Sequence, residues 1–232
     1  MEIIWDGFRD ALHRLLTGDA ETYRITWLSL RVSGIATLIS LLIGTPAGVG
    51  LALSHFPGRR LAIALVNTGM GFPPVVVGTV VSLFLFRHGP FGFLQLFLTP
   101  QGIIIAQVII ATPLVCGFTL AAIGGLDAKL HLQILALGAS RLQLFWLLLR
   151  EARLGLLAAV MAGFGAVISE VGATIAVGGN IKDQTRTLTG AIVLENGRGE
   201  FDQAIALSII LMVLIFAVNL VLTVAQQRGG RS

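Results

Sequence analysis

The chain has 232 residues, of which 55% are hydrophobic and only 12% are charged. Soluble domains carry about 25% charged residues, so this composition excludes an ordinary soluble protein and indicates a polytopic membrane protein. The formal net charge is +4, and because the basic residues lie between apolar runs, we attribute it to membrane topology and not to nucleic-acid binding.

Residues 1–25 precede the first apolar run and carry acidic and basic side chains in alternation. These charges leave no uninterrupted apolar core, so the segment lacks the pattern of a secretory signal peptide. Apolar residues recur at helical spacing, which favours an amphipathic helix on the membrane surface. A frayed polar tail is the alternative of equal weight.

Five apolar segments are long enough to cross about 30 Å of hydrocarbon at about 1.5 Å per residue. We predict spans at 26–53, 61–86, 102–124, 154–177 and 203–225. The fourth is the weakest prediction because Glu170 falls within it. The sequence therefore predicts an all-α fold with a transmembrane domain over 26–225 and a tail over 226–232.

Small residues and prolines shape two of these spans. Gly44 and Gly48 form a small-xxx-small pair, which allows two helices to approach closely. The adjacent Pro73 and Pro74 predict a bend that shapes a path or makes room for a partner helix, because proline removes a backbone donor at membrane depth. The single prolines of the first and third spans are interpreted as packing kinks.

The connections predict the orientation. The short loop 54–60 carries two arginines and no acidic residue, and the stretch 125–153 and the tail are also basic. With five spans these three segments lie on one side, which the positive-inside rule assigns to the cytoplasm. The N-terminus is then outside and the C-terminus cytoplasmic. Basic residues divide almost evenly between the two sides overall, so the prediction depends mainly on the short loop.

The stretch 125–153 carries charge and does not have the pattern of a span. It predicts two short helices joined at Gly138, where glycine permits a turn with positive φ. Leu142, Phe145 and Trp146 are apolar and aromatic residues of the kind that fill grooves on partner proteins. In a transporter that is driven by a separate ATPase, such a cytoplasmic helix would fit into a groove on the ATPase and relay its movement.

At this point the chain resembles the permease subunits of type I ABC importers. In that family a cytoplasmic coupling loop carries Glu-Ala-Ala, three residues and then glycine. The resemblance implies that the residues contacting the ATPase are Gly138, Ala139, Ser140, Arg141, Leu142 and Phe145. The chain departs from the motif at Leu132, Gln133 and Ile134, which stand where Glu-Ala-Ala would be.

The stretch "GFGAVISEVGATIAVGGNIKDQTRTLTGAI" (163–192) resembles the oxyanion-importing branch of that family, the molybdate and tungstate permeases. "SEVGATIAVGGNI" with "TRTLT" is closer to the tungstate-uptake permeases. The resemblance extends from about residue 26 to 225. It implies a permease homodimer in the cell inner membrane, assembled with two ATP-binding subunits and an extracytoplasmic oxyanion-binding protein.

The sequence agrees with a translocation subunit that is not itself an enzyme. It has no GxxxxGK[ST] phosphate loop and neither an HExxH nor a GxSxG motif. We therefore expect this chain to bind no cofactor or metal, ATP and Mg²⁺ being used by the partner subunit in an alternating-access cycle. Substrate choice would rest with the binding protein, so the sequence does not distinguish tungstate from molybdate, vanadate or sulfate.

Polar residues in and after the fourth apolar run are the candidate pathway or gate residues, together with Pro73 and Pro74. They are Ser169, Glu170, Thr174, Asn180, Thr185 and Arg186. A carboxylate repels an oxyanion, so we expect Glu170 to accept hydrogen bonds from helix ends or to pair with a base and fix a gate, with a proton relay as the alternative. The neutral residues either line the path or cap helices.

The segment 178–202 has a short apolar middle, Leu188 to Leu194, that is too short to span. We predict a short helix dipping into the outer face and ended by Asn196, Gly197 and Gly199. Arg186 would attract the anion or dock the binding protein; a solvated surface charge is the alternative.

A second functional class remains open. It is a stand-alone channel or ion-coupled transporter with Glu170 as its coupling carboxylate. An intramembrane enzyme has no catalytic set of residues in the sequence to support it.

Overall fold

The computed structural model describes residues 5, 7, 9–11, 17 and 19–229, and these residues form helices and turns with no strand. Most of the predicted surface helix at the N-terminus lies outside the described residues. The elements are α2 (Ala20–Leu53), α3 (Arg59–Met70), α4 (Pro74–Leu85), the 3₁₀ helix η1 (Gly92–Leu94), α5 (Pro100–Gly124), α6 (Ala128–Ala136), α7 (Arg141–Glu151), α8 (Arg153–Ile168), α9 (Gly172–Gly178), α10 (Leu188–Arg198) and α11 (Phe201–Gly229).

Within the described residues, three helices are long and apolar enough to cross a membrane alone, namely α2, α5 and α11. Two bent pairs also pass as broken spans: α3 with α4, bent by 99°, and α7 with α8, bent by 76°. Counting each pair as one span gives up to five, in agreement with the predicted all-α polytopic fold. The fourth span differs from its prediction because α8 ends at Ile168, well before residue 177.

The first helix also begins earlier than the predicted 26, at Ala20. The Asp19 side chain accepts a hydrogen bond from the Thr22 backbone N–H at 2.9 Å, which satisfies one of the free donors at the start of a helix. The hydropathy pattern missed this start because Glu21 and Arg24 make the first turns polar.

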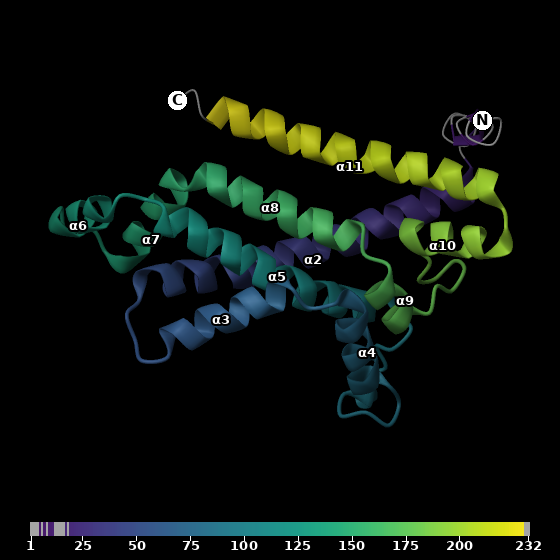
Figure 1. The fold of residues 1–232 in the computed structure, drawn as a ribbon, viewed down its shortest axis with the longest axis horizontal. Helices are drawn as coiled ribbons and strands as arrows, with labels where there is room; N and C mark the ends of the chain where they lie inside the picture. The colour runs from purple at the N-terminus through teal and green to yellow at the C-terminus, as the bar shows by residue number, and fades with distance from the viewer. Residues whose placement is uncertain (1–4, 6, 8, 12–16, 18, 230–232) are drawn as a thin grey trace.

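The predicted proline bend is confirmed between α3 and α4 (Figure 1). Pro73 is the N-cap of α4 and Pro74 occupies its first turn, where the missing N–H costs nothing. By contrast, α2 continues through Pro46 and α5 through Pro113. Figure 1 shows α4 leaving the long axis along which α2, α5, α8 and α11 run.

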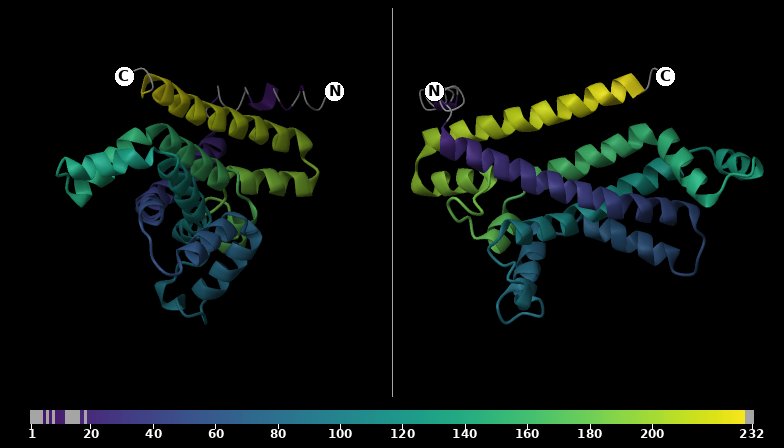
Figure 2. Two further views of the ribbon diagram at one scale, coloured as in Figure 1. Left: turned by 60° about the vertical axis from the view of Figure 1, so that its left-hand side comes forward. Right: turned by 180° about the vertical axis from the view of Figure 1, so that it is seen from behind.

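The most extensive helix–helix contact in the fold joins α2 to α5, which cross through the middle of the molecule (Figure 2). A Cβ atom added at Gly44 would lie 2.9 Å from the Thr112 carbonyl oxygen, and one at Gly48 would lie 2.6 Å from the Cys116 carbonyl oxygen. Both α2 positions therefore require glycine for this approach, as the small-xxx-small pattern predicts.

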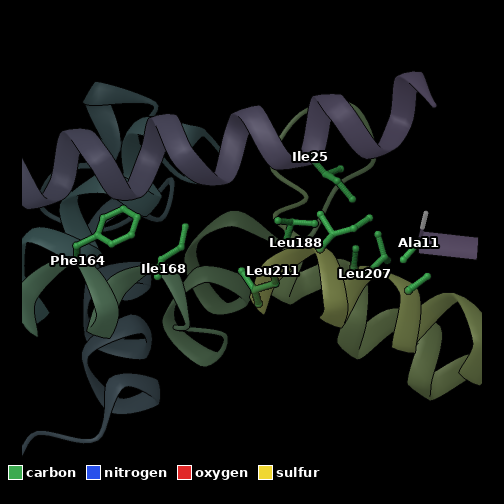
Figure 3. Packing of buried hydrophobic residues seen from close by; sticks show 10 residues of the cluster. Ala11, Ile25, Phe164, Ile168, Leu188, Leu207 and Leu211 are labelled. Carbon is green, nitrogen blue, oxygen red and sulfur yellow. The ribbon is translucent and has the colours of Figure 1, made fainter. Parts of the chain in front are cut away.

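The largest buried apolar cluster joins α2, α8, α10 and α11 at one end of the molecule (Figure 3). Ile25 of α2, Ile168 of α8, Leu188 of α10 and Leu207 of α11 all lie in it. Because Leu188 is fully buried there, α10 is anchored as part of the core. Figure 1 places α6, α7 and the α2–α3 turn at the opposite end of the molecule, the end toward which α11 also runs.

Candidate functional site

A break between α8 and α9 holds the first group of candidate residues. Glu170 is buried, and its carboxyl oxygens accept hydrogen bonds from the backbone N–H groups of Ala173 and Thr174, each at 2.9 Å. The Thr174 hydroxyl donates to the same carboxyl at 3.2 Å. Glu170 thus caps the first turn of α9, as an acidic side chain at a helix N-terminus should. The expectation of a hydrogen-bonded carboxyl is confirmed, and its role as a gate stays a prediction.

The sequence-based analysis missed a second residue at this break, Gln107 of α5. Its side chain is 2% exposed, and its Nε2 donates to the Val167 carbonyl oxygen at 3.0 Å. Its Oε1 is buried without a hydrogen-bond partner among the described residues. The hydrogen bond from Gln107 of α5 therefore fixes the end of α8 in place. In the sequence, the one indication of this role is a polar amide inside an apolar run.

The candidates in the turn after α9 hold that turn together. The Thr185 hydroxyl donates to the Gly178 carbonyl oxygen and accepts from the Ile181 N–H at 3.0 Å. Asn180 has a φ of 53° and donates through Nδ2 to the Gly190 carbonyl oxygen at 2.9 Å. Both side chains therefore form hydrogen bonds that stabilise local structure, in agreement with the alternative that the neutral candidates cap helices and turns.

Arg186 is not a solvated surface charge, because its side chain is only 12% exposed. Its Nη1 lies 3.4 Å from Glu21 of α2, and the same carboxyl lies 2.8 Å from Lys182 Nζ. Arg24 of α2 pairs with Asp183 on the same turn. These pairs tie the turn 181–186 to the first turns of α2. The sequence does not reveal this ion pair, because Glu21 lies far from Arg186 along the chain and only the tertiary structure brings them close. Attraction of the anion or docking of the binding protein by Arg186 stays a prediction.

The proline bend borders a hollow of about 270 Å³ that reaches from α3 and α4 to α5 and α8. Pro73 and Pro74 line it, together with Met70 of α3 and Ala166 of α8. Ser169 is exposed and donates to the Gly165 carbonyl oxygen at 2.7 Å. The structure thus brings the prolines near the end of α8, while Asn180, Thr185 and Arg186 lie beyond α9.

Helix α4 rests on α9 through contacts that leave no spare volume. A Cβ added at Gly78 would lie 2.4 Å from Ala173 Cα, and one at Gly172 would lie 2.3 Å from Val75 Cγ2. The proline bend and the Glu170 cap are therefore coupled by direct backbone contact.

We expect Gly78→Ala to destabilise the protein by about 1–3 kcal/mol, because the added methyl group forces α4 and α9 apart. Thermal unfolding of the purified chain in detergent measures this. Gly34→Ala is the matched control, since a Cβ there meets nothing within 4 Å. Equal unfolding temperatures for the two variants would contradict the packing argument.

The second group of candidates forms an elbow between α6 and α7, as predicted. Gly138 has a φ of +82°, the left-handed region that favours glycine. Ser140 begins α7 with a capping box in which its Oγ accepts from the Gln143 N–H at 3.3 Å and its N–H donates to Gln143 Oε1 at 2.8 Å. The elbow is therefore a defined turn, built from adjacent residues.

Apolar side chains stand exposed on the outer side of this elbow. Leu142 is 67% exposed and Trp146 is 62% exposed, and both line a hollow of about 660 Å³ with Gly138, Ala139 and Ser140. Phe145 differs from the other two predicted anchors because it is half-buried and packs against the core cluster of Leu144 and Leu148. Two of the three aromatic or apolar anchors are thus free to contact another protein.

The bent pair of α7 and α8 joins the two groups of candidates. Helix α7 turns into α8 at Ala152, and α8 then runs to the break at Glu170. Figure 1 shows α8 leading from the elbow to α9, with α10 beyond it.

Comparison with known proteins agrees with this arrangement. Residues 44–229 match the family model described as the binding-protein-dependent transport system inner membrane component. The tungstate uptake system permease protein TupB of Peptoclostridium acidaminophilum is 39% identical over 98% of this chain and 100% of its own length. A probable anion ABC transporter permease protein of Haloferax volcanii is 40% identical over 84% of this chain and 86% of its own.

The fold is also that of a solved transporter. A crystal structure of an inward-facing conformation of the MetNI methionine ABC transporter contains a chain that superposes with a TM-score of 0.72. The match covers 90% of this chain and 96% of that one, at 18% sequence identity.

Proposed function

Because this chain belongs to the family of binding-protein-dependent transport system inner membrane components, we propose that it is the membrane subunit of an ATP-driven importer of tungstate or a similar tetrahedral oxyanion. Its full-length relative is a tungstate uptake permease, and the other relative is described as an anion permease. The chain is a multi-pass inner-membrane transport subunit, and it translocates without catalysing a reaction itself.

The observation that carries the proposal is the exposed elbow. Leu142 and Trp146 leave a defined apolar surface on α7, a helix too short to span alone, and this surface lies beside the φ-positive Gly138. An apolar hollow of this kind fits an aromatic-anchored protein interface. The partner is a pair of ATP-binding subunits that use ATP and Mg²⁺, with a second copy of this chain completing the pore.

The orientation follows from the same end of the molecule. The first turn of α3 exposes Arg60 and contains Arg59, whose Nε donates to the Leu51 carbonyl oxygen at 2.8 Å, and the elbow and the end of α11 lie at this end too. We assign this end to the cytoplasm under the positive-inside rule. The start of α2 and α10 then face outward, where a binding protein delivers the oxyanion.

In this proposal, movement of the elbow changes the tilt of α8 and shifts the break at Glu170. Discontinuous helices of this kind form the transport site in many alternating-access transporters. Glu170 fixes the start of α9 and does not contact the anion. The stand-alone ion-coupled alternative is less favoured, because both Glu170 oxygens are already engaged by backbone donors.

Copurification from native membranes tests the partner assignment. We expect an ATP-binding protein to accompany the chain and Trp146→Ala to weaken that association by about thirtyfold or more, the factor for losing one interface anchor worth about 2 kcal/mol. Trp27→Ala is the control, because Trp27 is 67% exposed at the other end. The purified chain alone in liposomes should not accumulate tungstate; accumulation against a gradient without a partner would refute the proposal.

A further inference from the structure

A small pocket lies on the outer part of α2, away from the elbow and from the break at Glu170, and it includes one candidate pathway residue, Arg186. Its volume is about 190 Å³, and it is formed between α2 and the turn that precedes α10. Residues lining it include Arg24, Trp27, Arg31, Asp183, Gln184 and Arg186. Three guanidinium groups therefore face one carboxyl group, which leaves the pocket with excess positive charge.

The arginines of this pocket are not equivalent. Arg24 pairs with Asp183, and Arg186 lies 3.4 Å from Glu21. Arg31 is exposed and makes no ion pair or hydrogen bond with any other residue that the structure describes. A guanidinium in this position has all its donors available for a ligand.

The depth of Arg31 in the membrane follows from the sequence of α2. No charged residue occurs from 32 to 54, and about 20 residues of helix cross the hydrocarbon layer. Arg31 is therefore the first charged side chain beyond the hydrocarbon, at the level of the lipid headgroups. Trp27 lies about one turn further out and is 67% exposed, as is common for tryptophan at a membrane interface.

The same face of α2 continues inward as an apolar surface. Ile35 is 37% exposed, Leu38 is 58% exposed and Leu42 is 68% exposed, and these positions follow Arg31 at helical spacing. One face thus offers a basic pocket at headgroup depth and an exposed apolar stripe directly below it. This order matches the order of a phospholipid, with the phosphate outside and the acyl chains inside.

We propose that this pocket binds the phosphate of an anionic phospholipid such as phosphatidylglycerol. The Arg31 guanidinium donates to two phosphate oxygens, while the Trp27 indole N–H and the Gln184 amide supply further donors. The acyl chains lie against Ile35 and Leu38. A zwitterionic lipid binds less well, because its ammonium group meets the excess positive charge of the pocket.

Quenching of Trp27 by brominated lipids tests this site directly. The chain has 3 tryptophans, so Trp5→Phe with Trp146→Phe leaves Trp27 as the one reporter in the full chain. In phosphatidylcholine bilayers, we expect brominated phosphatidylglycerol to associate with the site about fivefold more strongly than brominated phosphatidylcholine. This factor corresponds to the attraction between one basic residue and an anionic lipid. Equal quenching by the two lipids would overturn the proposal.

Three variants in this background locate the effect. Arg31→Gln should remove the preference, whereas Arg31→Lys should keep most of it because the charge remains. Arg87→Gln should leave it unchanged, since Arg87 is exposed on the connection between α4 and α5, outside the pocket. A preference that survives Arg31→Gln would contradict the assignment of the site.

A free oxyanion shares the chemistry of a lipid phosphate, so one arm of the experiment distinguishes a soluble anion from a lipid headgroup as the ligand of the pocket. Tungstate and inorganic phosphate are added at millimolar concentration and compared with chloride at equal ionic strength. Unchanged quenching supports the lipid site. Saturable displacement of brominated phosphatidylglycerol by tungstate or phosphate, but not by chloride, would make the pocket a soluble-anion site and overturn the lipid assignment.

Discussion

Gly138→Asp is expected to lower ATP-driven oxyanion uptake by roughly thirtyfold or more, the effect of losing about 2 kcal/mol at one interface position, while the ATP-binding subunits continue to hydrolyse ATP. Gly138 forms the turn between α6 and α7 at a φ of +82°, and a Cβ there meets nothing within 4 Å. The side chain of the variant therefore projects into open space beside Leu142 and Trp146, where a carboxylate cannot be buried against a partner without a large desolvation cost.

Gly138→Asn is the matched control for this result. Asparagine and aspartate both tolerate the left-handed conformation better than most residues and have nearly the same size. The difference between the two variants therefore isolates the charge from the backbone strain. Uptake and substrate-stimulated ATP hydrolysis are measured on the same reconstituted preparation. Normal uptake with normal stimulation in the aspartate variant would show that the elbow does not enter a partner groove.

Glu170→Gln is expected to lower uptake about tenfold and to reduce stability by about 1–3 kcal/mol, the cost of leaving a buried donor without a partner. The two carboxyl oxygens now accept from the Ala173 and Thr174 N–H groups. A glutamine amide has one oxygen, so its NH₂ group must face one of these donors. The start of α9 then loses one of its two backbone cap hydrogen bonds, and the break at the end of α8 becomes less well defined.

The substrate preference should not change in Glu170→Gln, because the carboxyl is engaged with the backbone. Uptake of tungstate, molybdate and sulfate in competition checks this expectation. Glu195→Gln removes a charge from α10, where Glu195 pairs with Arg198 at 3.2 Å, and should leave uptake close to normal. An altered order of oxyanions in Glu170→Gln would instead place Glu170 in direct contact with the substrate.

Local chemistry made part of this fold predictable from the sequence. The bend at Pro73 and Pro74, the elbow at Gly138 and the end of α10 at Gly199 each depend on residues that restrict or extend the backbone within one or two positions. Such signals act over a few residues and do not require tertiary contacts. The same holds for the close approach at Gly44, where the absence of a side chain is itself the signal.

The parts that sequence analysis placed wrongly depend on distant partners. Helix α8 of the fourth predicted span stops at Ile168, although the sequence becomes apolar again after Glu170, because Glu170 caps a new helix and Gln107 holds the Val167 carbonyl group from α5. Arg186 is largely buried because Glu21 of α2 reaches it. Hydropathy averages over such contacts, so it predicted a continuous fourth span and left a free surface charge at Arg186 open as an alternative, and the fold has neither.

The length of α8 sets how far a small motion at the elbow can travel. Its 16 residues form a rod of about 24 Å at about 1.5 Å per residue. A rigid rod of that length that pivots by about 10° at Ala152 displaces its far end by about 4 Å, which is most of one helical turn. In the proposed transporter, a small rotation at the joint between α7 and α8 therefore becomes a displacement at the break before α9 that is large enough to open or shut a passage for a single hydrated ion.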